Sequence, residues 1–180
     1  SPKIKIGCTK SIGSFFLPHL LKTFEDNYGW LPDILIDNAH SIHQSLNRFE
    51  LDLALVETSI LDASLDSEFW RLDEMIVVAS RHHPFTHATQ VSYEQLNQER
   101  WVVREPNTAS RQFLETQLAN KFTQPIHHLT LNAFDAILLC VINNLGITFI
   151  TKECLNHPLY AEHLRPIKLP DNYLRNFNIV

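Results

Sequence analysis

The stretch IKIGCTKSIG, residues 4–13, decides how the fold of this chain is interpreted. Residues 4–8 alternate like a β-strand, and the apolar residues after Gly13 follow helical spacing. Between the two patterns lie Thr9, Lys10 and Ser11, at the expected start of the helix. A helix start exposes unpaired backbone N–H groups and a partial positive charge. This loop is therefore a candidate site for an anionic or polar ligand, although simple helix capping beside a solvated lysine would also explain it.

A second junction of the same form follows almost a hundred residues later. Residues 101–104 (WVVR) predict a strand, and the loop EPNTAS, residues 105–110, leads into a helix expected over 110–122. Arg104 is suited to pair with a ligand carboxylate or with groups near Glu105. Arg111 is expected to be structural or on the surface. The candidate ligand contacts in this loop are Arg104, Asn107, Thr108 and Ser110.

The first part of the chain alternates between strand and helix patterns. Strands are expected at residues 4–8, 34–36 and 51–56, with a helix over 16–24 and another that Ser41 would cap. This order, β-α-β-α-β, predicts a parallel doubly wound unit. Residues 69–72 and 75–79 predict two further strands, separated by a turn at Asp73 and Glu74.

The second part repeats the alternation after a break at residues 81–84 (RHHP). A short helix begins at Ser92, strands are expected at 100–104, 127–131 and 147–150, and a strongly apolar helix spans 134–141. The pattern at 174–180 predicts a last strand. We therefore expect an α/β fold in two lobes: lobe I, residues 1–80 plus 165–180, and lobe II, residues 81–164. Two loops of the same kind in separate units favour a small molecule held between the lobes.

Composition excludes some classes of function. The chain has 180 residues, 44% of them hydrophobic and 19% charged, with a formal net charge of −5. An acidic surface argues against binding to a phosphate backbone, so the chain itself is not expected to bind DNA or RNA. No apolar run approaches the roughly 20 residues of a membrane span, and no signal peptide precedes the first strand. Both ends fall beside strand patterns, which indicates a piece of a longer protein.

The cysteines and histidines show no metal or disulfide pattern. Cys8, Cys140 and Cys154 are three in number and form no C-x-x-C pair, which favours reduced thiols in a cytoplasmic protein. The histidine pairs lack the spacing of a zinc site, so no metal is expected. Catalytic motifs are also missing, and Glu57 at the end of a strand is a lone carboxylate without an acid or base partner. No catalytic residue and no cofactor are therefore predicted.

The sequence resembles the effector-binding domain of LysR-type transcriptional regulators over essentially all 180 residues. The resemblance rests on IKIGCT (4–9), LDLALVE (51–57), REP (104–106) and NLGITFI (144–150). It implies two Rossmann-like lobes of the periplasmic-binding-protein type II, with an effector in the cleft. It also implies a winged helix-turn-helix that would precede residue 1. By position, it assigns effector contacts to Thr9, Lys10, Ser11, Arg104, Asn107, Thr108, Ser110, Asn132 and Thr148.

One position departs from the family pattern. Relatives with an Arg-Glu-Pro motif often continue with glycines, whereas this loop continues with Asn107, Thr108 and Ala109. Asparagine tolerates the left-handed backbone region and is suited to replace a glycine there. The bulkier loop would still be able to reshape the pocket.

We therefore expect the sensory domain of a DNA-binding regulator that binds a small polar or anionic metabolite between its two lobes. The alternative is a periplasmic solute-binding protein of a transporter, and an enzyme on the same fold would need a reactive group in the cleft. The resemblance also implies a homodimer or tetramer that contacts DNA only through the N-terminal domain. More apolar surface than one helix stripe requires is offered by Phe15, Phe16, Leu20 and Phe24, and part of it is available for self-association. For any single one of these residues, full burial within one lobe is the equal alternative.

Overall fold

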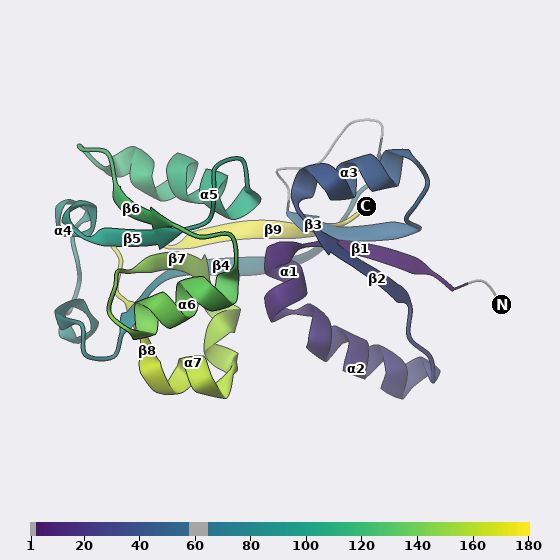
Figure 1. The fold of residues 1–180 in the computed structure, drawn as a ribbon, viewed down its shortest axis with the longest axis horizontal. Helices are drawn as coiled ribbons and strands as arrows, with labels where there is room; N and C mark the ends of the chain where they lie inside the picture. Colours follow the sequence, from purple (N-terminus) through teal and green to yellow (C-terminus); the bar gives the residue numbers. More distant parts are fainter. Residues whose placement is uncertain (1–2, 58–64) are drawn as a thin grey trace. The chain divides into compact units, whose positions relative to one another are not determined.

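The computed structural model describes residues 3–57 and 65–180, which form an α/β fold (Figure 1). The chain divides into two compact units. Unit 1 comprises residues 1–73 and 175–180, and unit 2 comprises residues 74–174. The lobe limits predicted from the sequence, after residue 80 and before residue 165, both fall inside unit 2, and the division at those limits remains a prediction. Within residues 3–57 and 65–180, every helix is too short or too polar to cross a lipid bilayer.

The sheet of unit 1 confirms the predicted β-α-β-α-β order. Strand β1 (Lys5–Thr9) pairs in parallel with β2 (Asp33–Asp37) on one side and with β3 (Leu53–Glu57) on the other. The last strand, β9 (Tyr173–Ile179), returns to pair antiparallel with β3, with Leu55 opposite Ile179. The predicted C-terminal strand is therefore confirmed, and it forms part of the first sheet.

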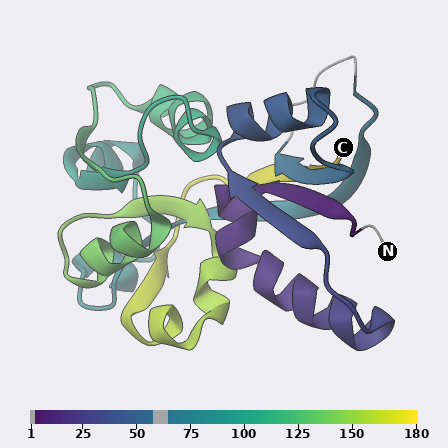
Figure 2. The same ribbon diagram turned by 45° about the vertical axis from the view of Figure 1, so that its right-hand side comes forward.

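Helices cover both faces of this sheet (Figure 2). Helices α1 (Lys10–Phe15) and α2 (Leu17–Tyr28) enclose a core with Cys8, Ile12, Phe16 and Phe177. Helix α3 (Ala39–Asn47) packs Ile42 against β3 on the other face. Buried side chains on both faces of the strands are typical of a doubly wound sheet. Phe16 is buried within unit 1, which is one of the two outcomes that the sequence left open for it.

The start of α3 differs from the sequence prediction. Asn38, not Ser41, is the N-cap, and its side chain accepts a hydrogen bond of 2.8 Å from the backbone N–H of Ser41. Ser41 therefore lies inside the first turn, three residues after the cap. Asparagine and serine are about equally good caps, so sequence pattern alone could not separate them.

Strand β4 also differs from the prediction. It runs without interruption over Glu68–Ser80, and the turn expected at Asp73 and Glu74 does not form. The carboxylate of Asp73 is buried and accepts a hydrogen bond of 2.8 Å from Nε of Arg175, 102 residues away in the sequence. That long-range partner satisfies the acid within the strand, where local propensity had favoured a turn.

Unit 2 contains two sets of paired strands. Strand β4 pairs antiparallel with β7 (Thr148–Thr151) and β8 (Leu164–Ile167), and β5 (Arg100–Val103) pairs in parallel with β6 (His127–Thr130). An isolated bridge between Trp101 and Ile147 links β5 to the segment before β7. The expected strands of the second lobe are thus present, but β7 is hydrogen-bonded chiefly to β4.

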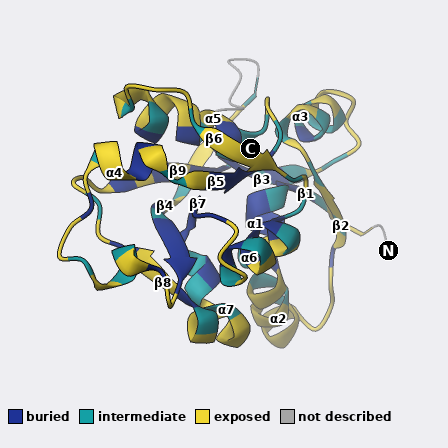
Figure 3. Ribbon diagram, turned by 60° about the vertical axis from the view of Figure 1, so that its left-hand side comes forward, coloured by how far each residue is buried: buried dark blue, intermediate teal, exposed yellow. Residues whose placement is uncertain are grey.

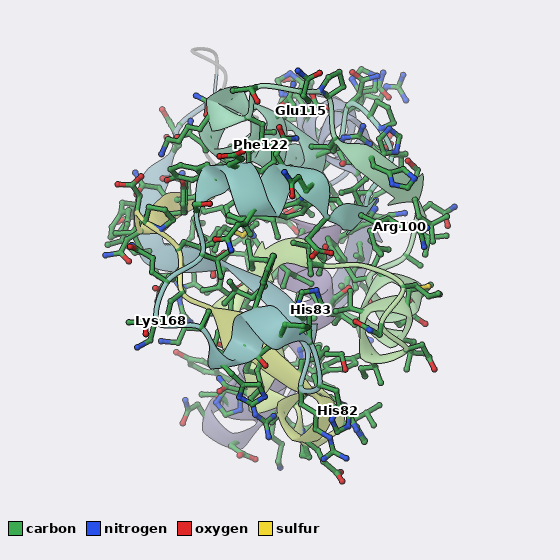
Figure 4. The ribbon with its side chains drawn as sticks, turned by 90° about the vertical axis from the view of Figure 1, so that its left-hand side faces the viewer. His82, His83, Arg100, Glu115, Phe122 and Lys168 are labelled. Atoms are coloured by element: carbon green, nitrogen blue, oxygen red, sulfur yellow. The ribbon has the colours of Figure 1, made fainter. Side chains whose placement is uncertain are left out.

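Short helical segments surround these strands. The predicted helix over 110–122 divides into α5, a π-helical segment η3 and a 3-10 segment η4, whereas the capping box of α4 confirms the predicted start at Ser92. The second half of β4, from Met75 onward, and the whole of β7 are largely buried (Figure 3). The break after β4 becomes η2, beginning beside the buried His83 (Figure 4). The bounds are η2 Pro84–His87, α4 Tyr93–Gln98, α5 Ala109–Phe113, η3 Leu114–Leu118, η4 Ala119–Lys121, α6 Phe134–Ile142, η5 Lys152–Asn156 and α7 Pro158–His163.

Candidate ligand-binding site

The β1–α1 junction of unit 1 presents one unsatisfied hydroxyl. Thr9 has the extended backbone of an N-cap, but its side chain makes no capping hydrogen bond. Its Oγ1 is buried, and none of the described residues is hydrogen-bonded to it. Lys10 begins α1 half-buried and forms no ion pair with the described residues. Thr9 and Lys10 therefore keep their polar groups available for a ligand.

Ser11 differs from its two neighbours in the loop. It is buried, and its Oγ accepts a hydrogen bond of 2.9 Å from Nη2 of Arg175. The same guanidinium donates from Nε to Asp73. Ser11 therefore helps to fix α1 to β9, a structural role that the sequence pattern did not reveal.

A fourth polar residue of unit 1, Glu57, ends β3 at the same edge of the sheet. Its side chain is 5% exposed, and its Oε1 lies 3.8 Å from Nη1 of Arg175. Within residues 3–57 and 65–180, neither carboxylate oxygen has a hydrogen-bond partner. Burial and the nearby charge of Glu57 raise the pKa of the Cys8 thiol to about 12. Cys8 is therefore a protonated, unreactive thiol at neutral pH.

The β5–α5 junction of unit 2 uses Arg104 differently. Its guanidinium is buried, donates from Nε to Oε1 of Glu105 at 2.7 Å, and lies over the ring of Phe134 with 4.8 Å from Cζ to the centroid. Of the two pairings that the sequence left open, the internal one is present. The stacked geometry holds the guanidinium in one orientation, which suits it to recognise a planar anion.

The loop after Arg104 is shaped by its own hydrogen bonds. Thr108 caps α5: its Oγ1 accepts from the N–H of Arg111 at 3.3 Å and donates to the carbonyl of Glu105 at 2.9 Å. Asn107 is exposed with a φ of 68°, so it takes the left-handed conformation expected for a residue that replaces glycine. Ser110 is half-buried, and its hydroxyl makes no hydrogen bond with the described residues.

Arg111 is structural, as expected. It is buried, and its Nη1 donates to the carbonyl of Arg104 at 2.8 Å. Its Nε donates to Oε1 of Glu115, also at 2.8 Å, on the segment that follows α5 (Figure 4). The side chain thereby fixes the loop that contains Arg104.

The remaining two candidates have unequal access to a ligand. Asn132 is exposed and follows β6, whose end lies beside the end of β5 because the N–H of Leu131 donates to the carbonyl of Val103. Carboxyl ends of parallel strands share one edge of a sheet, so Asn132 and Arg104 occupy the same edge of unit 2. Thr148, in contrast, is buried and donates from Oγ1 to the carbonyl of Val102 at 2.6 Å.

A separate pocket of about 440 Å³ lies in unit 2, outside the predicted contacts. Its lining mixes acidic and basic side chains with apolar ones, and none of the candidate residues belongs to it. Examples of its lining are Glu74, Ile76, Lys152 and Lys168, of which Lys168 is labelled in Figure 4. Among the residues that the structure describes, no group of three or more His, Cys, Asp or Glu side chains is arranged to hold a metal.

Known proteins resemble this chain over its whole length. The profile of the family described as LysR substrate binding domain matches residues 1–180. The HTH-type transcriptional regulator CysL of Bacillus subtilis is 27% identical over 178 residues, which is 98% of this chain and 58% of CysL. The uncharacterized HTH-type transcriptional regulator YeiE of Escherichia coli is 25% identical over 168 residues, 93% of this chain and 57% of YeiE. The chain thus spans little more than half the length of these relatives.

Solved structures share the fold. The OxyR2 regulatory domain (C206S mutant) of Vibrio vulnificus superposes with a TM-score of 0.87 at 20% identity, covering 99% of this chain and 86% of that domain. The regulatory domain of CcmR from Synechocystis PCC6803, solved in complex with 2-PG, has a TM-score of 0.85 at 19% identity, covering 98% and 85%. These neighbours are regulatory domains of the periplasmic-binding-protein type II-like fold, which confirms the predicted fold class.

Proposed function

Since this chain belongs to the LysR substrate-binding domain family, we propose that it is the effector-sensing part of a DNA-binding transcriptional regulator. The observation that carries the proposal is the match of the family profile to all 180 residues, together with relatives that are HTH-type regulators. The match favours this function over the solute-binding protein of a transporter. DNA binding would then belong to a winged helix-turn-helix that precedes residue 1, because the chain itself is acidic.

We propose that the effector is a small anionic metabolite and that the domain has no catalytic role. In unit 1, Thr9 and Lys10 offer a hydroxyl and an ammonium group that no other described residue engages. In unit 2, Arg104, Asn107, Ser110 and Asn132 offer further donors at one edge of its strands. Ser11, Thr108 and Thr148 already make internal hydrogen bonds, so their proposed contribution is to shape the site. Two structures support an anionic ligand by analogy: the sulfate-bound regulatory domain of a second OxyR2 mutant, E204G, of Vibrio vulnificus (TM-score 0.87, 20% identity), and the CcmR complex with 2-PG.

The first prediction concerns the effector. A thermal-shift screen of carboxylates, phosphates and sulfur oxyanions should find a ligand, which at a hundred times its dissociation constant stabilises the fold by about 2.7 kcal/mol. Lys10→Met should then weaken binding about 10-fold or more, because a charge-assisted contact is lost. Lys22→Met is the matched control, since Lys22 pairs with Asp26 on the exposed surface of α2. Equal affinity in the two variants would remove the β1–α1 loop from the site.

The second prediction concerns assembly. We propose that unit 1 mediates a homodimer, or pairs of dimers in a tetramer, through its edge strand β2 and helix α2. Apolar side chains exposed on this surface include Tyr28, Trp30, Leu35 and Ile36, and the half-buried Leu20 and Phe24 lie on α2. Burial of such a patch is favourable by the usual hydrophobic term. Sedimentation should show a dimer at micromolar concentrations, and Leu35→Lys with Ile36→Lys should give a monomer. A monomer for the unmodified chain would exclude this interface.

A further inference from the structure

The pocket of unit 2 has the size of a small-molecule site. Its volume is about 440 Å³, within the roughly 300–1,000 Å³ that is typical of ligand pockets. All of its lining residues belong to unit 2, and none belongs to the candidate loops. The apolar part of the lining includes Met75, Ile167 and Leu169, which belong to the main core cluster of unit 2 or pack against it. Core packing therefore holds this wall of the pocket in place.

Hydrogen bonds join the segments that form another wall. The backbone N–H of Val91 donates to the carbonyl of Lys168 at 2.9 Å. Next to it, Nε2 of Gln90 donates to the carbonyl of Leu169 over a longer distance of 3.5 Å. These bonds link the segment before α4 to the segment after β8, and both segments line the pocket. The pocket is therefore enclosed by segments that are bonded to one another.

The charges of the lining leave one cation uncompensated. The carboxylate of Glu74 lies 3.5 Å from Nζ of Lys152. The carboxylate of Asp171 lies 3.1 Å from Nζ of Lys121. Lys168 lines the same pocket (Figure 4) and forms no ion pair with the part of the chain that the structure describes. Because each acid already has a cation beside it, the lining as a whole favours an anion.

The pocket also borders both connections between the two units. Glu74 is the first residue of unit 2, and Asn172 comes directly before β9, which continues into unit 1. A molecule bound in the pocket would contact both of these segments. A second ligand can therefore act here on the connecting segments, apart from the loops that contain Thr9 and Arg104.

We propose that this pocket is a second ligand site, for a small organic anion with an apolar body. The anionic group contacts the ammonium group of Lys168, and the body covers apolar lining residues such as Ile167 and Leu169. The inference goes beyond the proposed effector site and does not depend on it, because the two share no residue. Apolar contact supplies most of the affinity, since an exposed ionic contact contributes little.

Three probes separate the two parts of this recognition: hexanoate, hexanamide and acetate. Hexanamide has the chain without the charge, and acetate has the charge with a shorter chain. In titrations followed by ¹H–¹⁵N correlation spectra, hexanoate should shift backbone amides within residues 74–76, 89–90 and 167–172. Its affinity should exceed that of hexanamide about 2- to 5-fold, the effect of one exposed ionic contact. It should exceed that of acetate about 10- to 100-fold, because part of the longer chain becomes buried.

Two charge variants test the electrostatic part. Lys168→Met keeps most of the apolar stem and should bind hexanoate and hexanamide equally. Lys22→Met, on the exposed surface of α2, is the matched control and should retain the preference for hexanoate. Glu74→Gln should have the opposite effect and bind hexanoate about 2- to 5-fold more tightly, because it releases Lys152 from its ion pair.

A third variant changes no charge. Thr89 is exposed and lines the pocket, so Thr89→Trp can fill it without disturbing the core, and should weaken hexanoate binding about 10-fold or more. Shifts confined to residues outside the lining would overturn the site, as would no shift at the highest concentration that leaves the protein folded. Equal affinity of the unmodified protein for hexanoate and hexanamide would overturn the anionic ligand class. The effector function is tested separately, by the metabolite screen.

Discussion

At the β5–α5 junction of unit 2, the hydroxyl of Thr108 makes two hydrogen bonds, whereas at the β1–α1 junction of unit 1 the hydroxyl of Thr9 makes none. The two junctions share a strand, a hydroxyl-bearing loop and a helix start. In unit 2 the loop itself satisfies the threonine hydroxyl. In unit 1 the threonine hydroxyl is buried, and no described residue satisfies it. One sequence pattern can therefore either stabilise the fold or leave polar groups for a ligand. Only the hydrogen bonds of the loop distinguish the two roles.

The largest expected effect contrasts two buried arginines, one in each unit. Arg175→Met should destabilise the protein by about 3–5 kcal/mol, because it leaves the buried acid Asp73 without its close cation. Arg111→Met should cost only about 1–3 kcal/mol, since Glu115 is 52% exposed and can be solvated by water. Methionine keeps most of the apolar stem in both cases. Urea unfolding measures the free energy of unfolding of both variants. An equal loss of stability in the two would contradict the expected difference.

A smaller effect tests the two threonines directly. Thr108→Val should cost about 1 kcal/mol, because the variant lacks the helix cap. Thr9→Val should be neutral or stabilising, because valine has the same shape without a buried unsatisfied hydroxyl. Thermal unfolding of the two variants beside the unmodified protein provides the measurement. If Thr9→Val lowered the stability as much as Thr108→Val, the hydroxyl of Thr9 would be contributing to the fold as the hydroxyl of Thr108 does, which would contradict the comparison.

The smallest effect concerns a second satisfied network, on the surface of unit 2. The hydroxyl of Tyr93 is hydrogen-bonded to Asp171, Tyr173 and Lys121. Burial and the Asp171 hydrogen bond raise the pKa of Tyr93, and hydrogen bonds to the two tyrosines raise the pKa of Lys121. Unfolded tyrosine loses its proton near pH 10, so stability should decline as the pH rises above that value.

The Lys121 contribution has the same sign. Its folded pKa is the higher one, so its stabilisation is complete below the unfolded pKa of about 10.5 and is lost as the pH rises through the folded value. Above about pH 10, the melting temperature of Tyr93→Phe should therefore fall less with rising pH than that of the unmodified protein. Parallel melting curves of the two proteins across that range would contradict the prediction.

The sequence predicted most of the architecture because its apolar periods are clear. The strand at 4–8 and the helix that begins near Leu17 are local patterns, and Asn107 at a φ of 68° follows from the chemistry of its side chain. The error in β4 arose where a distant partner decides, whereas the error in the cap of α3 arose between two local candidates of equal preference. Asp73 stays in a strand because Arg175, 102 residues later, binds it.

The local structure of the two candidate loops was predictable from the sequence, but their hydrogen bonds were not. Sequence pattern identified Thr9 and Thr108 as equivalent, and could not show that one hydroxyl is satisfied and the other is not. It noted Glu57 only as a lone carboxylate. The one signal in the sequence was an acidic residue directly after a run of apolar strand residues, at a position where burial is expected. Acidic residues are rarely buried without a role.

The pairing of β9 with β3 has a consequence for the order of folding during synthesis. Leu55 faces Ile179, so the sheet of unit 1 lacks this strand until the last residues of the domain leave the ribosome. Unit 2, residues 74–174, is continuous in the sequence and has all of its residues earlier. We expect the second half of the translated chain to fold first, against the usual N-terminal order of translation. Until β9 has been synthesised, the sheet of unit 1 would remain incomplete.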